Sequence, residues 1–180
     1  LTAATAINLG GNITLGNIAG GGVTVTGPAV LTAAVDVDAS ANNGTISFSS
    51  TINNDDSGTA RNLQLDTGTG SITVSGIIGD VGNSGVAIGT IDINQTDGAG
   101  VITLAGIGNG TTAAGNTGQV DIGNSATADL NLSGTFFTNG QTTYEASSTA
   151  GATDENIDIT ATTTFKTSDD AIIFSTAAID

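Results

Sequence analysis

Apolar and small polar residues alternate in three short segments of the chain that share one phrase: residues 44–49, 70–75 and 100–105. Each segment begins with glycine and then places its apolar side chains two positions apart, which is typical of a strand with one buried face. No segment shows the spacing of three and four that is typical of an amphipathic helix. The pattern therefore predicts an all-β fold built from strands of about three to six residues.

A second series of alternating segments lies between these phrases, at residues 63–65, 91–93 and 120–122. The first apolar residues of the two series follow one another at steps of 17, 9, 19, 11 and 18 residues. A long step and a short step alternate, so the sequence predicts coils of about 28 residues. A fixed period between roughly 20 and 50 residues is typical of solenoids, propellers and arrays.

Stacking explains how strands this short can be stable. A strand of three residues cannot hold a sheet by itself, but a parallel ladder forms when it lies ~4.8 Å above a like strand of the previous coil. The sequence thus predicts a parallel β-solenoid with short strands and Gly/Asn-rich corners, in which Ile46, Ile72 and Ile102 form one column along a common axis. The alternative is an Ig-like β-sandwich repeat, which usually has longer strands and a buried aromatic anchor. Aromatic residues make up only 3% of this chain.

The chain is predicted to be a single repeat-built β domain, residues 1–180, taken from a longer chain. It begins at Leu1 with neither an initiator methionine nor a signal-peptide pattern. Residues 6–11 resemble residues 129–134 at an offset of 123, and residues 46–48 resemble residues 172–174 at an offset of 126. We interpret this longer echo as an internal unit of 123 to 126 residues that contains several coils.

The chain has 17 acidic and 2 basic residues, which gives it a formal net charge of −15. Nucleic acid is therefore not expected as a partner, because phosphate contacts need clustered lysine and arginine. Anionic membrane surfaces are disfavoured for the same reason. No apolar run reaches roughly 18 residues, so membrane insertion is not expected. High glycine content and net charge are also typical of disordered chains, but the regular recurrence of aliphatic residues favours a folded chain.

The composition restricts catalytic chemistry. The absence of histidine and cysteine excludes Ser-His-Asp and Cys-His nucleophiles and histidine-bound zinc. Adjacent carboxylates, the residue type that glycoside hydrolysis needs, occur at residues 55–56, 154–155 and 169–170. Each pair lies in a polar segment where a solvated turn is the simpler interpretation. The chain is therefore predicted not to be an enzyme, and a polysaccharide-active β-helix enzyme is the weakest alternative.

Calcium is the better chemical hypothesis, because it prefers several oxygen ligands from carboxylates, amides and backbone carbonyls. The candidate ligands are Asn54, Asp55, Asp56, Asp154 and Glu155. The glycine-rich nonapeptide of calcium-binding β-rolls and the EF-hand loop are both absent, and solvated turns are the alternative interpretation. Asp36 and Asp38 alternate with Val35 and Val37, so we expect both carboxylates to point outward from one strand.

The glycine-led phrases, the Leu-x-Leu strands and the phrase from Thr138 to Tyr144 resemble the repeats of filamentous-haemagglutinin-like giant adhesins of bacteria. The resemblance covers most of residues 6–176, and it departs from the family because the phrase ending at Tyr144 occurs once and carries an extra threonine. The resemblance implies a right-handed parallel β-solenoid, export across the cell envelope and an extracellular location at the bacterial cell surface.

The sequence therefore predicts a structural segment of a cell-surface adhesin or extracellular fibre that acts as an extended stalk. Its expected partners are neighbouring repeats of the same chain or like subunits in a fibre. Host, cell-surface or matrix ligands are expected at loops comprising residues 53–59, 79–85 and 108–117. The alternative is a self-assembling extracellular filament subunit whose copies join through exposed strand edges.

Overall fold

Every pairing between the strands of the described residues is parallel. The structure is a computed structural model of the 180-residue chain. It describes residues 1–17, 20–55, 57–80, 87–95, 98–110, 113–147, 157–168 and 170–175. An Ig-like sandwich is built from antiparallel strands, so the parallel pairing excludes the sandwich alternative.

Most strands have two to six residues, about as the sequence predicted, but residues 130–138 and 157–167 form strands of 9 and 11 residues. No α-helix occurs in the described part of the chain. The strands are β1 (Ile7–Leu9), β2 (Ile13–Thr14), β3 (Val23–Val25), β4 (Ala29–Leu31), β5 (Val35–Asp38), β6 (Ile46–Phe48), β7 (Ile52–Asn54), β8 (Leu63–Asp66), β9 (Ile72–Val74), β10 (Ile91–Ile93), β11 (Ile102–Ile107), β12 (Val120–Ile122), β13 (Leu130–Thr138), β14 (Thr142–Glu145), β15 (Ile157–Thr167) and β16 (Ile172–Ser175). A short 3-10 helix, η1 (Ser40–Asn42), forms the corner between β5 and β6.

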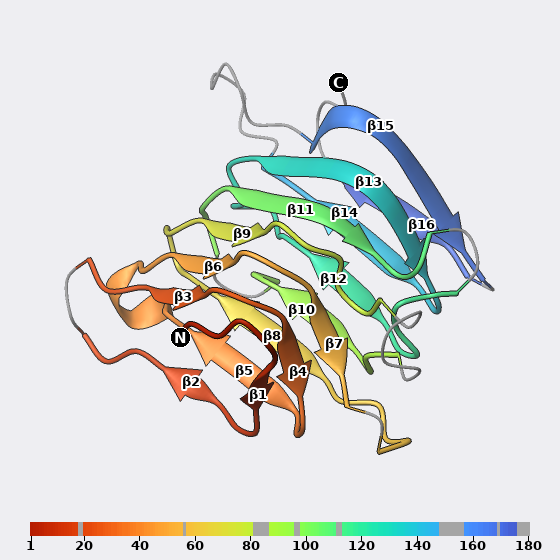
Figure 1. Cartoon of the computed structure of the whole chain (residues 1–180). Coiled ribbons are helices and arrows are strands. Elements are labelled where there is room, and N and C mark those ends of the chain that lie inside the picture. Colours follow the sequence, from red (N-terminus) through yellow and green to blue (C-terminus); the bar gives the residue numbers. More distant parts are fainter. Residues whose placement is uncertain are drawn as a thin grey trace.

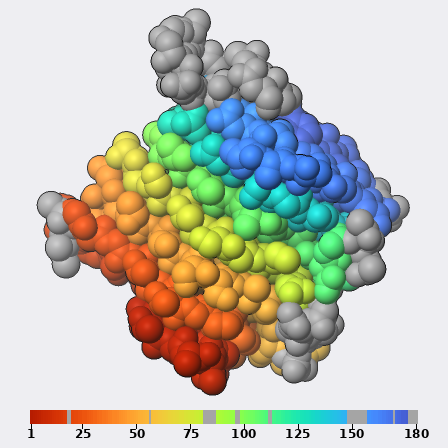
Figure 2. Space-filling model, turned by 45° about the horizontal axis from the view of Figure 1, so that its top comes forward, coloured from red at the N-terminus to blue at the C-terminus, as the bar shows by residue number. Residues whose placement is uncertain are grey.

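The strands form three sheets in which neighbours lie one coil apart. The seven-stranded sheet has the order β16-β14-β12-β10-β8-β5-β2, and the six-stranded sheet has the order β15-β13-β11-β9-β6-β3. The third sheet contains β1, β4 and β7. Figure 1 shows these strands stacked from β1 and β2 at one end to β15 and β16 at the other, and Figure 2 shows the coils as successive bands. The fold is therefore a parallel β-solenoid of about five turns, as the sequence predicted.

Like side chains stack on one another inside the solenoid. Ile46 pairs with Ile72, and Ile72 pairs with Ile102. The same column continues to Val23 at one end and to Leu130 and Ile157 at the other. Because these side chains are buried, they contribute most of the favourable free energy of stacking. The predicted isoleucine column is confirmed.

Another column of apolar residues passes through Ile78, a position that is paired only by isolated bridges. It contains Ile7, Ala29, Ile52, Ile78, Ile107, Phe136 and Phe165.

One boundary prediction is wrong, because the polar loop expected from residue 53 begins later. Asn53 and Asn54 belong to β7 and are buried. Their amides hydrogen-bond across the corners instead of facing solvent, which the polar composition of the segment did not reveal.

Buried asparagine stabilises the corners, as the composition suggested. Asn94 has a left-handed backbone conformation with φ of 51°, which asparagine adopts more readily than most residues. Its side-chain Oδ1 accepts a hydrogen bond of 2.8 Å from the backbone N–H of Thr67 in the coil below. Its Nδ2 donates a hydrogen bond of 2.9 Å to Oγ1 of the same threonine. Neighbouring coils are therefore held in register by polar contacts inside the core as well as by apolar columns.

The segments that resemble each other at offsets of 123 and 126 residues do not occupy equivalent positions in the described coils. Ile46 lies in the six-stranded sheet, whereas Ile172 lies in the seven-stranded sheet. Ile7 lies in β1 of the third sheet, whereas Leu130 begins β13 of the six-stranded sheet. The internal unit of 123 to 126 residues stays a prediction, and residues flanking this chain would test it.

Candidate functional site

The outer face of the seven-stranded sheet carries a ladder of carboxylates. In β5, Val35 and Val37 are buried in the core while Asp36 and Asp38 are only partly buried. This confirms that the two aspartates point outward. The same alternation in β8, β10 and β12 places Asp66, Asp92 and Asp121 on that outer face. We call these five aspartates the acidic ladder.

The strand register decides which members of the acidic ladder meet. Asp38 lies opposite Asp66, and Asp92 lies opposite Asp121. Gln64 lies between Asp36 and Asp92, because it pairs with both. Its Nε2 donates a hydrogen bond of 2.7 Å to Oδ2 of Asp66. A neutral amide at this point interrupts the row of like charges, which otherwise destabilise neighbouring strands.

The members of the acidic ladder differ in how readily they ionise. Burial raises the pKa of the Asp66 carboxyl to about 6; the hydrogen bond from Gln64 partly offsets the shift, and neighbouring carboxylates add to it. Burial also raises the pKa of Asp36, with a smaller contribution from Asp38. Burial raises the pKa of Asp92 as well; a hydrogen bond from the backbone of Gln95 partly offsets this shift, and Asp121 and Asp36 add to it. One oxygen of Asp36 and one of Asp66 are buried and accept no hydrogen bond from the described residues. The environment of these carboxyls therefore favours the neutral form.

Asp38 behaves in the opposite way. Hydrogen bonds from the side chain and the backbone of Ser40 lower its pKa. The hydroxyl donates at 2.6 Å and the backbone N–H at 2.8 Å, both to Oδ1 of Asp38. These donors favour the charged form. Asp38 thus holds Ser40, the first residue of η1, and the acidic ladder contains both an ionised structural carboxylate and carboxyls that are poorly solvated.

A hollow of about 330 Å³ lies beside two members of the acidic ladder, Asp36 and Asp92. Its polar lining comes from successive coils: Asn12, Asp36, Asn62, Gln64, Thr90 and Asp92. Asn12 accepts a hydrogen bond of 3.1 Å from the backbone N–H of Asp36, and Asn62 accepts one of 3.0 Å from that of Thr90. The hollow can offer carboxylate and amide oxygens to a cation or to a hydroxyl-rich ligand. No histidine, cysteine or aromatic side chain lines it.

Sequence reasoning did not single out Asp66, Asp92 and Asp121. A signal was present, because Asp92 and Asp121 are the central residues of the Ile-Asp-Ile and Val-Asp-Ile strands. Each aspartate alone is an ordinary outward-facing residue of a strand. Only the register of the coils, in which these central positions pair directly, brings the carboxylates together.

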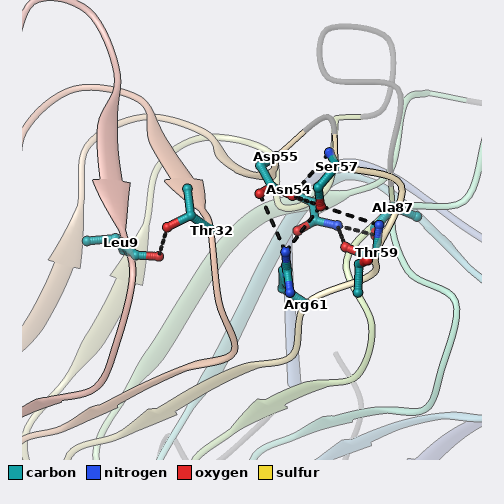
Figure 3. A network of polar contacts seen from close by, with 8 residues as sticks. All are labelled: Leu9, Thr32, Asn54, Asp55, Ser57, Thr59, Arg61 and Ala87. Carbon is teal, nitrogen blue, oxygen red and sulfur yellow. Dashed lines mark hydrogen bonds and ion pairs between the residues drawn. The ribbon is translucent and has the colours of Figure 1, made fainter.

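Asn54, a predicted calcium ligand, lies at the end of β7 and is used structurally. Its Nδ2 donates hydrogen bonds of 2.7 Å to the carbonyl of Thr59 and 3.2 Å to that of Ala87 (Figure 3). The side chain is almost fully buried. It closes the corner after β7 and links that corner to the next coil.

Asp55, the neighbouring predicted ligand, faces a cation of the protein itself. Its Oδ2 lies 3.6 Å from the guanidinium of Arg61, and its Oδ1 accepts a hydrogen bond from the hydroxyl of Ser57 (Figure 3). The hydrogen bond from Ser57 lowers the pKa of Asp55, with a further contribution from Arg61. The positive charge of Arg61 repels a second cation at this point and therefore disfavours calcium binding by Asp55.

The other predicted ligands, Asp56, Asp154 and Glu155, lie outside the described residues. Among the residues that the structure describes, no three acidic side chains are grouped so that they could hold a metal ion together. In the same part of the chain, no helix is long and apolar enough to cross a membrane. Calcium binding stays a prediction.

Comparison of this chain with protein-family models, with curated proteins and with solved structures gives no match. The resemblance to filamentous-haemagglutinin-like adhesins therefore rests on the repeated phrases of the sequence and on the parallel solenoid that they form.

Proposed function

We propose that this protein is a structural segment of a cell-surface adhesin or extracellular fibre, in which the solenoid acts as an extended stalk. The observation that carries the proposal is the unbroken stacking of apolar columns along the molecule. The column through Ile13, Val37, Leu65, Ile93, Ile122, Tyr144 and Phe174 joins every strand of the seven-stranded sheet. Each coil is held by its neighbours through a full ladder, so length is added without a new core.

Ligand contact fits the corners on one side of the stalk. Asn53 in β7 is joined by hydrogen bonds to the segments at the equivalent place in the next two coils. The backbone N–H of Asp80 donates at 2.8 Å to Oδ1 of Asn53, and Nδ2 of Asn109 donates at 3.0 Å to Oδ1 of Asp80. Parts of the loops expected at residues 79–85 and 108–117 therefore lie above the end of β7, from which the first of the three loops begins. A receptor that binds these segments would contact several coils at once.

The location outside the cell can be tested directly. Antibodies raised against the folded chain should label intact cells of the source organism as strongly as permeabilised cells. Brief protease treatment of intact cells should remove the label while a cytosolic marker protein stays intact. Labelling that requires permeabilisation would contradict the proposal.

A filament subunit is the second candidate function. It is favoured by one observation, the incompletely buried apolar residues at both ends of the solenoid. Phe165 and Phe174 at one end, and Ile7 and Ile13 at the other, are only partly buried although they belong to core columns.

A further inference from the structure

The last coil leaves part of its apolar interior uncovered. Ile159 of β15 is 37% exposed, whereas Leu132, its partner in the coil below, is fully buried. Phe165 and Phe174 are partly buried, whereas the residues beneath them, Phe136 and Tyr144, are each only 1% exposed. The difference has a simple cause, because inner coils are covered on two sides. The last coil is covered by described strands on one side only.

Two stacks of aromatic rings end at this surface. Phe165 lies on Phe136 with 5.3 Å between the ring centroids and an interplanar angle of 17°. Phe174 lies on Tyr144 at 5.1 Å and 16°. Phe165 and Phe174 meet edge to face at 5.0 Å, which ties the two stacks together. The surface is therefore a continuation of the packing inside the solenoid and not a scatter of apolar side chains.

The backbone of the terminal strands can also pair with a further strand. β15 and β16 are the last strands of their sheets, and β1 and β2 are the first strands of theirs. A terminal strand presents unpaired N–H and C=O groups along one edge and is a template for another strand. Because all coils run in the same direction, a strand added at either end would pair in parallel like those inside.

The two ends match each other column by column. Phe165 belongs to the column that begins at Ile7, and Phe174 belongs to the column that begins at Ile13. Ile7 and Ile13 are themselves partly buried. A second copy placed on the last coil would therefore set Ile7 over Phe165 and Ile13 over Phe174, as if the solenoid had gained another turn.

We propose that copies of this chain associate head to tail, with the first coil of one copy stacked on the last coil of the next. The occupant of the exposed end is a second copy because its first coil offers strands β1 and β2 with the matching direction and the columns that begin at Ile7 and Ile13. The contact joins two different surfaces and repeats with the same operation, so it builds an open rod and not a closed dimer. This association holds whether or not the chain acts at a cell surface.

Charge sets the conditions for this association. Each copy carries a net charge of −15, so stacking brings like charges together. Screening by salt reduces this repulsion, and the Debye length falls from about 10 Å at 0.1 M to about 3 Å at 1 M salt. Sedimentation velocity should therefore show species that grow with protein concentration and with added sodium chloride. A chain that stays monomeric at high concentration in 1 M salt would overturn the proposal.

Blocking each end in turn tests the direction of stacking. Phe174→Asp places a charge on the last coil, and Ile13→Asp places one on the first coil. Each variant alone should sediment as a monomer, with association weakened by at least about tenfold. An equimolar mixture should form dimers and nothing longer, because one intact copy of each end remains. Self-association of either variant at the wild-type level, or a mixture that stays monomeric, would overturn head-to-tail stacking.

The matched control is Ile173→Asp, a change on the same strand whose side chain faces outward over Thr143. This variant should associate like the unmodified chain, and loss of association with it would count against contact through the interior columns. Circular dichroism and the thermal midpoint (Tm) establish that each variant is folded.

A disulfide trap tests the register without altering the apolar end. The chain has no cysteine, so Ser175→Cys and Thr14→Cys together introduce a single pair. Thr14 and Ser175 each follow directly after a member of the column that runs from Ile13 to Phe174, and parallel neighbours at ~4.8 Å can form a disulfide. Oxidation should yield a covalent ladder on a non-reducing gel. The pair Ser175→Cys and Thr24→Cys, which joins different sheets, should not, and equal ladders from both pairs would contradict the register.

Discussion

At the scale of single residues, the acidic ladder contains two facing aspartates with opposite surroundings. Asp38 and Asp66 are cross-strand partners. Hydrogen bonds from Ser40 favour the charged form of Asp38, whereas burial favours the neutral form of Asp66. The same residue type on the same face thus has opposite effects on stability at neutral pH.

Replacing these two aspartates should change stability in opposite directions. Asp66→Asn removes a poorly solvated charge and should raise the Tm at pH 7 by about 2 to 4 °C. Asp38→Ala removes the acceptor for the two hydrogen bonds from Ser40 and should lower the Tm by a similar amount. Differential scanning calorimetry of both variants measures the effect. A lower Tm for Asp66→Asn at pH 7 would contradict the assigned cause of its pKa.

The pH dependence of stability follows from the same shifts. The pKa of Asp66 is about 6 in the folded chain, above the value of 3.8 that it has when solvated. Its ionisation therefore opposes folding fully above pH 6, and the opposition disappears as the pH falls toward 4. The Tm of the unmodified chain should rise as the pH is lowered from 7 to about 5. In Asp66→Asn this rise should be smaller, and the two proteins should converge near pH 4.

At the scale of single elements, a glycine two residues before each of β6, β9 and β11 allows neighbouring coils to approach. A Cβ atom built on Gly70 would collide with the carbonyl oxygen of Gly44, and one built on Gly100 would collide with that of Gly70. These glycines are required by close backbone approach, and their φ angles are not positive. The glycine that begins each repeated phrase thus has a steric role that its place in the sequence only hinted at.

Gly70→Ala should therefore destabilise the solenoid. The added methyl group must push two coils apart, at a cost of about 2 to 3 kcal/mol in the free energy of unfolding. Gly11→Ala is the matched control, because a Cβ atom there meets nothing within 4 Å. Urea unfolding followed by circular dichroism compares the two variants. Equal midpoints for Gly70→Ala and Gly11→Ala would show that the coils do not approach as described.

At the scale of the whole molecule, the stacked coils concentrate like charge. The net charge of −15 includes the acidic ladder, whose members lie on neighbouring strands. Screening should therefore stabilise the fold, and the Tm should rise as sodium chloride is raised from about 0.02 to 0.5 M. A Tm that falls over this range would contradict the view that charge repulsion opposes the stacked state.

Calcium chloride at the same ionic strength separates screening from specific binding. A rise in Tm beyond that in sodium chloride, removed by Asp55→Asn, would support the predicted site at Asn54 and Asp55. An equal rise in Tm for the unmodified chain and for Asp55→Asn would place any calcium effect elsewhere on the acidic surface.

Much of the fold could be predicted from the sequence because its determinants are local and repeated. The two-residue period of the phrases defines which face of each strand is buried. The recurrence of about 28 residues predicts that Ile46, Ile72 and Ile102 share a column, and they do. The outward orientation of Asp36 and Asp38 followed from the same alternation. Strand β7 was missed, because asparagine in a polar segment looks like a loop until its amide is buried against the next coil.

The sequence by itself determined an all-β chain of short strands, the period of its coils and its strongly acidic character. These properties depend on residue type and on spacing along the chain. Only the tertiary structure decided which carboxylates face one another, why Asp66 and Asp38 differ, and what the two ends of the solenoid expose. The physical reason is that each of these depends on the register between coils, which brings together residues more than twenty positions apart.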